Sequence, residues 1–198
     1  MLLFLLVLGF VVIRMAASKK LSPRVALPKL ICFDLDGTIW YPDMYMLWGG
    51  GAPFTIVNAQ KLLDNAGQEV KLLGISGKIL QDINTQEEFK DTQVAWVSKT
   101  DEPSWADECL RKFETPSGIK LIDTAQHKHV YKGSKASHFR NLQRETGVSF
   151  DDMLFFDNES GNIQTVSSLG VISVYCPDGM TEEIWLEGLR RFEKSRNY

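Results

Sequence analysis

Two closely spaced aspartates are the residues of this 198-residue chain that most clearly suggest chemistry. They stand in Asp34-Leu-Asp36-Gly-Thr38, where the short apolar run of residues 29–34 ends. Side chains two residues apart on extended backbone point to the same side. One carboxylate can therefore attack an electrophile while the other gives and takes a proton. An Asp-Gly pair after a strand can also be only a turn, with Thr38 capping the next element, but the residues downstream favour the chemical interpretation.

Polar residues also end two other apolar runs. Ser98 ends residues 94–98, Asp157 ends residues 153–157, and Lys135 stands at the start of a predicted helix. Ligands of open parallel sheets bind at the carboxyl ends of the strands, so we expect these side chains to meet Asp34 and Asp36 at one edge. Clustered carboxylates repel each other without a cation, and oxygen ligands suit Mg²⁺. The sequence therefore predicts a magnesium site.

The elements that must position these residues alternate between strands and helices, which predicts an α/β fold with a parallel sheet covered by helices on both faces. Residues 60–63 and 69–73, on either side of Asp64-Asn-Ala-Gly67, predict a hairpin, and a helix over 56–65 is the competing interpretation. Apolar runs and helical spacing predict strands at 29–34, 94–98, 119–122, 130–131, 153–157 and 171–175, and helices at 76–90, 102–113, 134–146, 160–169 and 181–195.

Composition excludes several classes of protein. The net charge of −3 leaves no basic footprint, so we expect no nucleic-acid partner. The three cysteines, Cys32, Cys109 and Cys176, are too few and too scattered for a disulfide framework or a zinc site. His127 and His129 form an H-x-H pair without further metal ligands nearby, which favours a surface pair.

Four blocks of the sequence resemble a known family. FDLDGT is similar to the first motif of the haloacid dehalogenase (HAD) superfamily. Together with AWVSKT, YKGSKASHFRNLQRETGVSF and DDMLFFDNESGNI it resembles the magnesium-dependent phosphatase family over about residues 27–190. The resemblance implies a three-layer Rossmann-like HAD fold and a phosphatase that hydrolyses phosphomonoesters with Mg²⁺ through an aspartyl-phosphate intermediate.

The same resemblance implies a role for each matching residue. Asp34 would be the nucleophile, and Asp36 would protonate the leaving group and later activate water. The Asp34 carboxylate and the Asp36 backbone carbonyl would hold Mg²⁺. Ser98, with the backbone amide of Lys99, would bind the phosphoryl oxygens, and Lys135 would neutralise charge between Asp34 and the phosphoryl group.

Asp157 and Asn158 match the motif that closes the metal site, with one departure. The family often has Asp-Asp here, and Asn158 offers a neutral carbonyl oxygen instead, so we expect weaker Mg²⁺ affinity. A catalytically weakened phosphate- or phosphoprotein-binding module is therefore the alternative function. The argument against this alternative is that a site used only for binding need not keep the acid/base Asp36.

The spacing of the motifs predicts an open site. Only 61 residues separate Asp36 from Ser98, which leaves room for a flap at about 41–74 but not for a large cap domain. A phosphorylated protein side chain or a small sugar phosphate could enter, and the sequence does not choose between them. The aromatic residues Trp40, Tyr41, Tyr45 and Trp48 either pack under the flap or line the entrance.

The N-terminal 20 residues form a segment separate from the predicted domain at 27–198. Residues 1–13 carry no charge. The run is shorter than the roughly 20 residues that span a bilayer and suits the apolar region of a signal peptide. No positive region precedes it, and Met15 is a plausible alternative start. We therefore expect either a cytoplasmic protein starting at Met15, or membrane contact through residues 1–13 with anchoring, secretion or organelle targeting.

Overall fold

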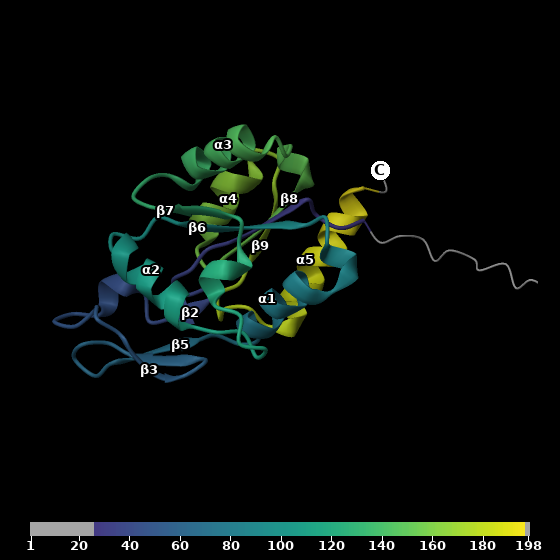
Figure 1. The fold of residues 1–198 in the computed structure, drawn as a ribbon. Coiled ribbons are helices and arrows are strands. Elements are labelled where there is room, and N and C mark those ends of the chain that lie inside the picture. The colour runs from purple at the N-terminus through teal and green to yellow at the C-terminus, as the bar shows by residue number, and fades with distance from the viewer. Residues whose placement is uncertain (1–25, 197–198) are drawn as a thin grey trace, which may run out of the picture.

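The computed structural model describes residues 26–196, and its centre is a five-stranded parallel sheet (Figure 1). In spatial order the strands are β7 (His127–Val130), β6 (Gln93–Ser98), β1 (Leu30–Phe33), β8 (Met153–Asp157) and β9 (Ile172–Tyr175). All neighbouring strands run parallel. β1 lies in the middle with all four side chains buried. This burial on both faces explains why its sequence is a continuous apolar run.

Helices cover both faces of the sheet and complete a three-layer fold. They are α1 (Ser76–Thr85), α2 (Pro103–Lys112), α3 (Lys135–Thr146), α4 (Ser160–Ser167) and α5 (Glu182–Ser195). Leu30 and Cys32 of β1 belong to a core that includes residues of α3 and α4. Ile31 and Phe33 belong to the opposite core, with residues of α1, α2 and α5. Figure 1 shows the same division, and the predicted fold class is confirmed.

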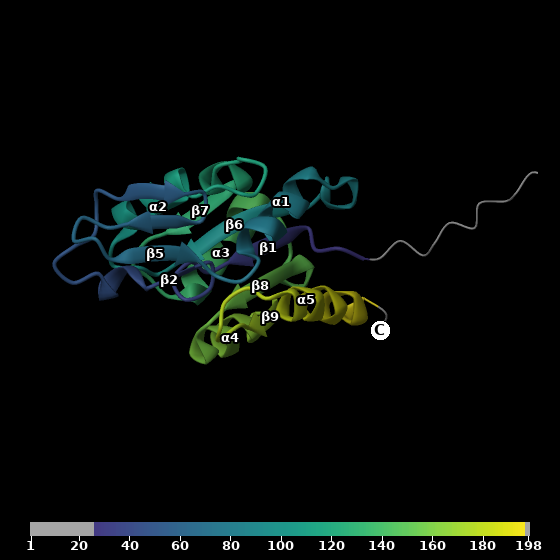
Figure 2. The same ribbon diagram turned by 90° about the horizontal axis from the view of Figure 1, so that it is seen from below.

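The flap is a second, antiparallel sheet that stands beside the central one (Figure 2). Its strands are β2 (Trp40–Tyr41), β5 (Glu69–Leu72), β4 (Lys61–Leu63) and β3 (Thr55–Asn58), in that spatial order. The predicted hairpin corresponds to β4 and β5, and the competing helix over 56–65 is wrong. The reason is the turn between them, in which the Asp64 carboxylate accepts the backbone N–H groups of Ala66 and Gln68 at 2.9 and 2.7 Å. The described fold contains no large cap domain.

Three other predictions differ from the structure. The short strand expected at 130–131 is β7, which covers His127–Val130 instead. The sequence predicts a strand over residues 119–122, but a 3₁₀ helix covers Leu121–Thr124. Buried Leu121 and the Thr124 hydroxyl, which donates to the Leu121 carbonyl at 2.7 Å, stabilise this turn instead. The helix expected over 76–90 ends at Thr85, and a short 3₁₀ helix, Glu87–Phe89, comes after it.

Capping residues set the helix ends as the sequence indicates. The side chains of Ser134 and Thr181 accept backbone N–H groups at the starts of α3 and α5, and Gly147 ends α3 with a φ of 71°. Cys32, Cys109 and Cys176 are buried and unpaired. The predictions for residues 1–20 lie outside the described residues. Within residues 26–196, every helix is too short or too polar to cross a membrane.

Candidate active site

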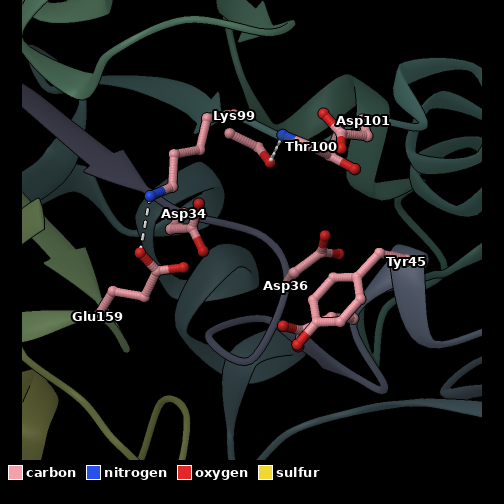
Figure 3. A pocket seen from close by; sticks show the side chains of 9 residues that line it. Asp34, Asp36, Tyr45, Lys99, Thr100, Asp101 and Glu159 are labelled. Carbon is pink, nitrogen blue, oxygen red and sulfur yellow. Dashed lines mark hydrogen bonds and ion pairs between the residues drawn. The ribbon is translucent and has the colours of Figure 1, made fainter.

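Three neighbouring strands end at the same edge of the sheet and bring the predicted residues together. Asp34 comes directly after β1, Ser98 ends β6, and Asp157 ends β8. The backbone of Asp34 continues the sheet, because its N–H donates to the Phe156 carbonyl at 3.0 Å. A pocket of about 160 Å³ opens at this edge (Figure 3). It is lined by Asp34, Asp36, Asp43, Tyr45, Ser98, Lys99, Thr100, Asp101 and Glu159.

Lys135 joins two of the strand ends beneath the pocket. It is 2% exposed, and its ammonium group contacts Asp34 and lies 3.1 Å from the Asp157 carboxylate. It also donates to the Val97 carbonyl at 2.5 Å. Burial alone would lower the pKa of Lys135, but Asp34 and Asp157 outweigh that effect and raise it. Lys135 is therefore a permanent buried cation beside Asp34.

Asp34 lies at the floor of a pocket with excess negative charge. Burial raises the pKa of the Asp34 carboxyl, Lys135 works against the rise, and the charges of Asp157 and Asp36 add to it. One ammonium group thus faces three carboxylates. A second cation at this floor would lower the pKa of Asp34 and favour its ionised form.

Asp36 has the environment of an acid/base group. Its carboxylate accepts the indole N–H of buried Trp40 at 2.7 Å. Burial raises the pKa of Asp36 to about 6, the Trp40 hydrogen bond works against the rise, and the charge of Asp43 adds to it. A carboxyl group with this pKa exchanges a proton readily near neutral pH.

Asn158 lies against the backbone just beyond Asp36. Its backbone N–H donates to the Thr38 hydroxyl at 3.1 Å, and that hydroxyl lies 3.5 Å from the Asn158 Oδ1. A Cβ added to Gly37 would lie 2.1 Å from the Asn158 Nδ2, so only glycine leaves room for this side chain. Gly37 also has a φ of 69°, which glycine adopts without strain. The chain thus brings the Asn158 amide beside Gly37, the residue after Asp36.

Asp157 is fully buried and held on both carboxylate oxygens. The Asn162 amide donates to them at 3.1 and 2.9 Å, and the Glu159 N–H donates to Oδ1 at 2.7 Å. With Lys135 as a further contact, the carboxylate is well occupied by protein donors. Asn162 was missed by the sequence reasoning. Its place in the first turn of the helix after a strand-ending carboxylate is the signal that could have found it.

The donor set fits a hard divalent cation. Among the described residues, no three His, Cys, Asp or Glu side chains are placed to hold a metal by themselves. The predicted site needs no such group of three side chains. Its ligands are the Asp34 and Asp157 carboxylates, the backbone carbonyl of Asp36 and the amide oxygen of Asn158. Oxygen donors and the unbalanced carboxylates suit Mg²⁺.

Ser98 and Lys99 occupy different depths of the pocket. Ser98 is buried, and its hydroxyl accepts the Thr100 N–H at 3.2 Å. The Lys99 side chain is 40% exposed and pairs with Glu159 at 2.7 Å (Figure 3). The sequence reasoning missed Glu159, along with the other lining residues Asp43, Thr100 and Asp101.

Of the remaining candidates, Tyr45 lies in the pocket and the others lie outside its lining. Tyr45 lines the pocket, whereas Trp40 is buried and stacks on Phe113 with ring centroids 6.0 Å apart. His127 and His129 are absent from the pocket lining, and His129 is buried, so the expected surface pair is wrong for His129. They contact opposite oxygens of the Glu145 carboxylate, at 2.6 and 2.8 Å.

This combination of fold and site is that of a HAD-superfamily phosphatase, and comparisons with known proteins agree. A family model described as acid phosphatase matches residues 26–195. Magnesium-dependent phosphatase 1 of Homo sapiens is 33% identical over 172 residues, covering 86% of this chain and 90% of that protein. A HAD-like hydrolase superfamily protein of Schizosaccharomyces pombe is 30% identical over 155 residues, covering 75% of this chain and 85% of that protein. The chain belongs to the acid phosphatase family.

A solved structure supports the fold. A HAD family enzyme from Bacteroides thetaiotaomicron, in its magnesium complex, superposes with a TM-score of 0.54. It is 13% identical and covers 81% of this chain and 99% of that one. This likeness concerns the architecture of the chain and carries no argument about substrate.

Proposed function

We propose that this Mg²⁺-dependent phosphatase hydrolyses phosphomonoesters through a phosphoryl group carried on Asp34. One observation carries the proposal: buried Lys135 contacts Asp34 and Asp157 directly beneath a pocket that Asp36 also lines. Nothing in the site favours the alternative of a weakened binding module, since the proposed nucleophile Asp34 and the proposed acid/base Asp36 both line the pocket.

The first chemical step is transfer of the phosphoryl group to Asp34. An Asp34 oxygen forms a bond to phosphorus while the bond to the ester oxygen breaks. Asp36 gives its proton to that leaving oxygen, which departs as an alcohol or phenol. Ser98 and the Lys99 amide donate to the phosphoryl oxygens, and Lys135 balances the charge of Asp34. Mg²⁺, when bound, supplies positive charge that stabilises the negative charge of the phosphoryl group during transfer.

The second step returns Asp34 to its starting state. Asp36, now ionised, takes a proton from water as the water oxygen bonds to phosphorus. The bond between phosphorus and the Asp34 oxygen breaks and inorganic phosphate leaves. Asp36 ends protonated, ready for the next ester. Its pKa of about 6 suits both directions of proton transfer.

Asp157 and Asn158 complete the proposed metal ligands. For Asn158 the support is its position against Gly37, the residue that follows Asp36. For Asp157 it is a buried carboxylate at the same sheet edge, although Asn162, Lys135 and the Glu159 N–H already occupy its oxygens. We also propose a second role for Asp157, which is to hold Lys135 against Asp34.

The substrate is a phosphorylated molecule whose organic part stays largely outside the pocket. Pockets that enclose an entire organic ligand measure roughly 300–1,000 Å³, and this one measures about 160 Å³. It accepts a phosphoryl group and its ester oxygen. Both a phosphorylated protein side chain and a small sugar phosphate satisfy that requirement.

We further propose that residues 27–198 act as the catalytic domain, with residues 41–74 as its flap, and that residues 1–20 are a separate segment. The support is a core that closes within residues 26–196 and a family match that begins at residue 26. Membrane contact through residues 1–13 rests on their apolar sequence alone.

Hydrolysis of 4-nitrophenyl phosphate tests the proposed function. Turnover should require Mg²⁺, stop with EDTA and return when Mg²⁺ is added in excess. Lys135→Met should reduce kcat by a factor of about 100 or more, since it removes the cation that balances Asp34. Binding of phosphate without any turnover in Mg²⁺ would instead support the binding module.

A further inference from the structure

The pocket is too small for an organic leaving group, so such a group must contact the residues around the opening. The outer lining consists of Asp43, Tyr45, Lys99, Asp101 and Glu159, which we call the pocket mouth. In Figure 3 the Lys99–Glu159 pair and Tyr45 stand on opposite sides of the view, with Asp34 and Asp36 between them. The chemistry of the pocket mouth therefore decides which leaving groups are accepted.

Carboxylates outnumber available cations at the pocket mouth. Asp43, Asp101 and Glu159 contribute three negative charges. Lys99 pairs with Glu159 at 2.7 Å, and Lys132, outside the lining, pairs with Asp101 at 3.1 Å. Both lysines are thus engaged by carboxylates. No ion pair of Asp43 is seen among the described residues.

Glu159 and Asp43 both line the pocket, and the charge of Glu159 acts on Asp43. Burial raises the pKa of the partly buried Asp43, and the charge of Glu159 adds to the rise. A negatively charged leaving group would add a further like charge to this pair. A positively charged one would relieve the repulsion.

Tyr45 adds an independent preference of the same sign. Its side chain is 65% exposed and lines the pocket two residues after Asp43. The face of an exposed aromatic ring attracts cations through its quadrupole and packs on neutral apolar groups, and it repels an anion placed over it. An aromatic ring beside a carboxylate is a combination that recognises ammonium groups.

We propose that Asp43 and Glu159, with Tyr45, make the pocket mouth select phosphomonoesters whose leaving group is neutral or positively charged and reject those that carry a second anionic group. This inference rests on the proposed phosphatase function and specifies its substrate class. Asp43 and Glu159 act as specificity residues, whereas Asp34 and Asp36 perform the chemistry.

Three phenyl phosphates of nearly equal size test the proposal. Their para substituents are 2-aminoethyl, ethyl and carboxymethyl, which are positive, neutral and negative near pH 7. Because a methylene group insulates each charge from the ester, the three leaving groups differ little in reactivity. We expect kcat/KM to fall in that order, by about threefold for each unit of charge. The first and the last ester differ by two unit charges and should therefore differ about tenfold, as expected for weak, solvent-screened interactions with the carboxylates. The difference should shrink in high salt.

Charge-removing variants assign the preference to residues. Asp43→Asn leaves the Lys99–Glu159 pair in place and should reduce the cation-to-anion ratio of kcat/KM by about threefold. Glu159→Gln should reduce it at least as much, because it also releases Lys99. Asp91→Asn is the matched control: exposed Asp91 precedes the N-terminal end of β6, whereas the pocket lies at the opposite end of that strand. It should leave the ratio unchanged.

The outcomes separate this inference from the proposed function. Absence of turnover with the neutral ester in Mg²⁺ contradicts the phosphatase function itself. Equal kcat/KM for all three esters, or a preference that survives both Asp43→Asn and Glu159→Gln, overturns only the charge selection. The neutral ester also reports folding of each variant. The cation-to-anion ratio of kcat/KM separates charge selection from any change in Asp36, whose pKa the charge of Asp43 raises, because Asp36 acts equally on all three esters.

Discussion

Gly37→Ala separates the metal role of Asn158 from ordinary backbone strain. Gly37 has a φ of 69°, and an alanine forced into this conformation costs about 1–2 kcal/mol. The added Cβ would also lie 2.1 Å from the Asn158 Nδ2 and 2.7 Å from its Cγ. Neither distance is sterically possible, so the Asn158 side chain must rotate away from residue 37. If Asn158 holds Mg²⁺, its displacement should raise the half-maximal Mg²⁺ concentration for activity about tenfold or more.

Gly147→Ala supplies the matched control. Gly147 has a φ of 71°, and nothing lies within 4 Å of a Cβ added there. The free energy of unfolding, measured by urea denaturation, should fall by a similar amount in both variants. Each kcal/mol lost corresponds to a decrease of about 2–4 °C in Tm. Only Gly37→Ala should change the Mg²⁺ titration, measured both by activity and by calorimetric binding of Mg²⁺.

A double-mutant cycle completes the test. In an Asn158→Ala background, Gly37→Ala has no amide to displace and should leave the Mg²⁺ midpoint where Asn158→Ala alone puts it. Asn158 is not a ligand if Gly37→Ala and Gly147→Ala give the same midpoint, or if Gly37→Ala weakens Mg²⁺ binding as much in the Asn158→Ala background as in the wild type.

Other residues give three further tests. Asn158→Asp adds a ligand charge and should lower the Mg²⁺ activation midpoint; a midpoint that does not fall removes Asn158 from the ligands. Burial lowers the pKa of His138 from 6.5 to about 4, with Lys135 adding repulsion, so the folded protein loses stability as pH falls from about 6.5 to 4. His138→Leu should remove roughly 3 kcal/mol of that loss between pH 7.5 and 4, and parallel slopes of unfolding free energy against pH would refute this. A chain starting at Met15 should stay soluble and fully active while the full chain fractionates with membranes or is processed near Ser18; aggregation of the shorter chain beside a soluble full chain would contradict the separate N-terminal segment.

The sheet edge could be predicted because its geometry depends on local sequence. Each apolar run ends where the strand ends, and parallel strands share one edge, so Asp34, Ser98 and Asp157 had to approach each other. Lys135 could be placed beside them because Ser134 marks the start of its helix. The structure brings Lys135 into contact with both Asp34 and Asp157, which the alternation of elements alone could not specify.

The pocket mouth could not be predicted because loop paths determine it. Tyr45 lies in a short 3₁₀ helix, Met44–Met46, which begins directly after Asp43, and no periodicity encodes the direction of this segment. Glu159 reaches the pocket through the turn into α4. The strand expected at 119–122 fails for a related reason. A run of few apolar residues is equally compatible with a strand and a tight turn, and burial of Leu121 decided between them.

Detection of a phosphoryl group on Asp34 is the decisive measurement for the proposed mechanism. Wild-type protein mixed with excess 4-nitrophenyl phosphate and Mg²⁺, quenched in acid within the first turnover and digested, should yield the Asp34-containing peptide with the added mass of one phosphoryl group. Asp34→Asn should show neither this peptide nor turnover, while urea denaturation shows that it remains folded. Turnover with no phosphoryl group on Asp34, a phosphoryl group on another residue, or substantial activity in Asp34→Asn would contradict the mechanism.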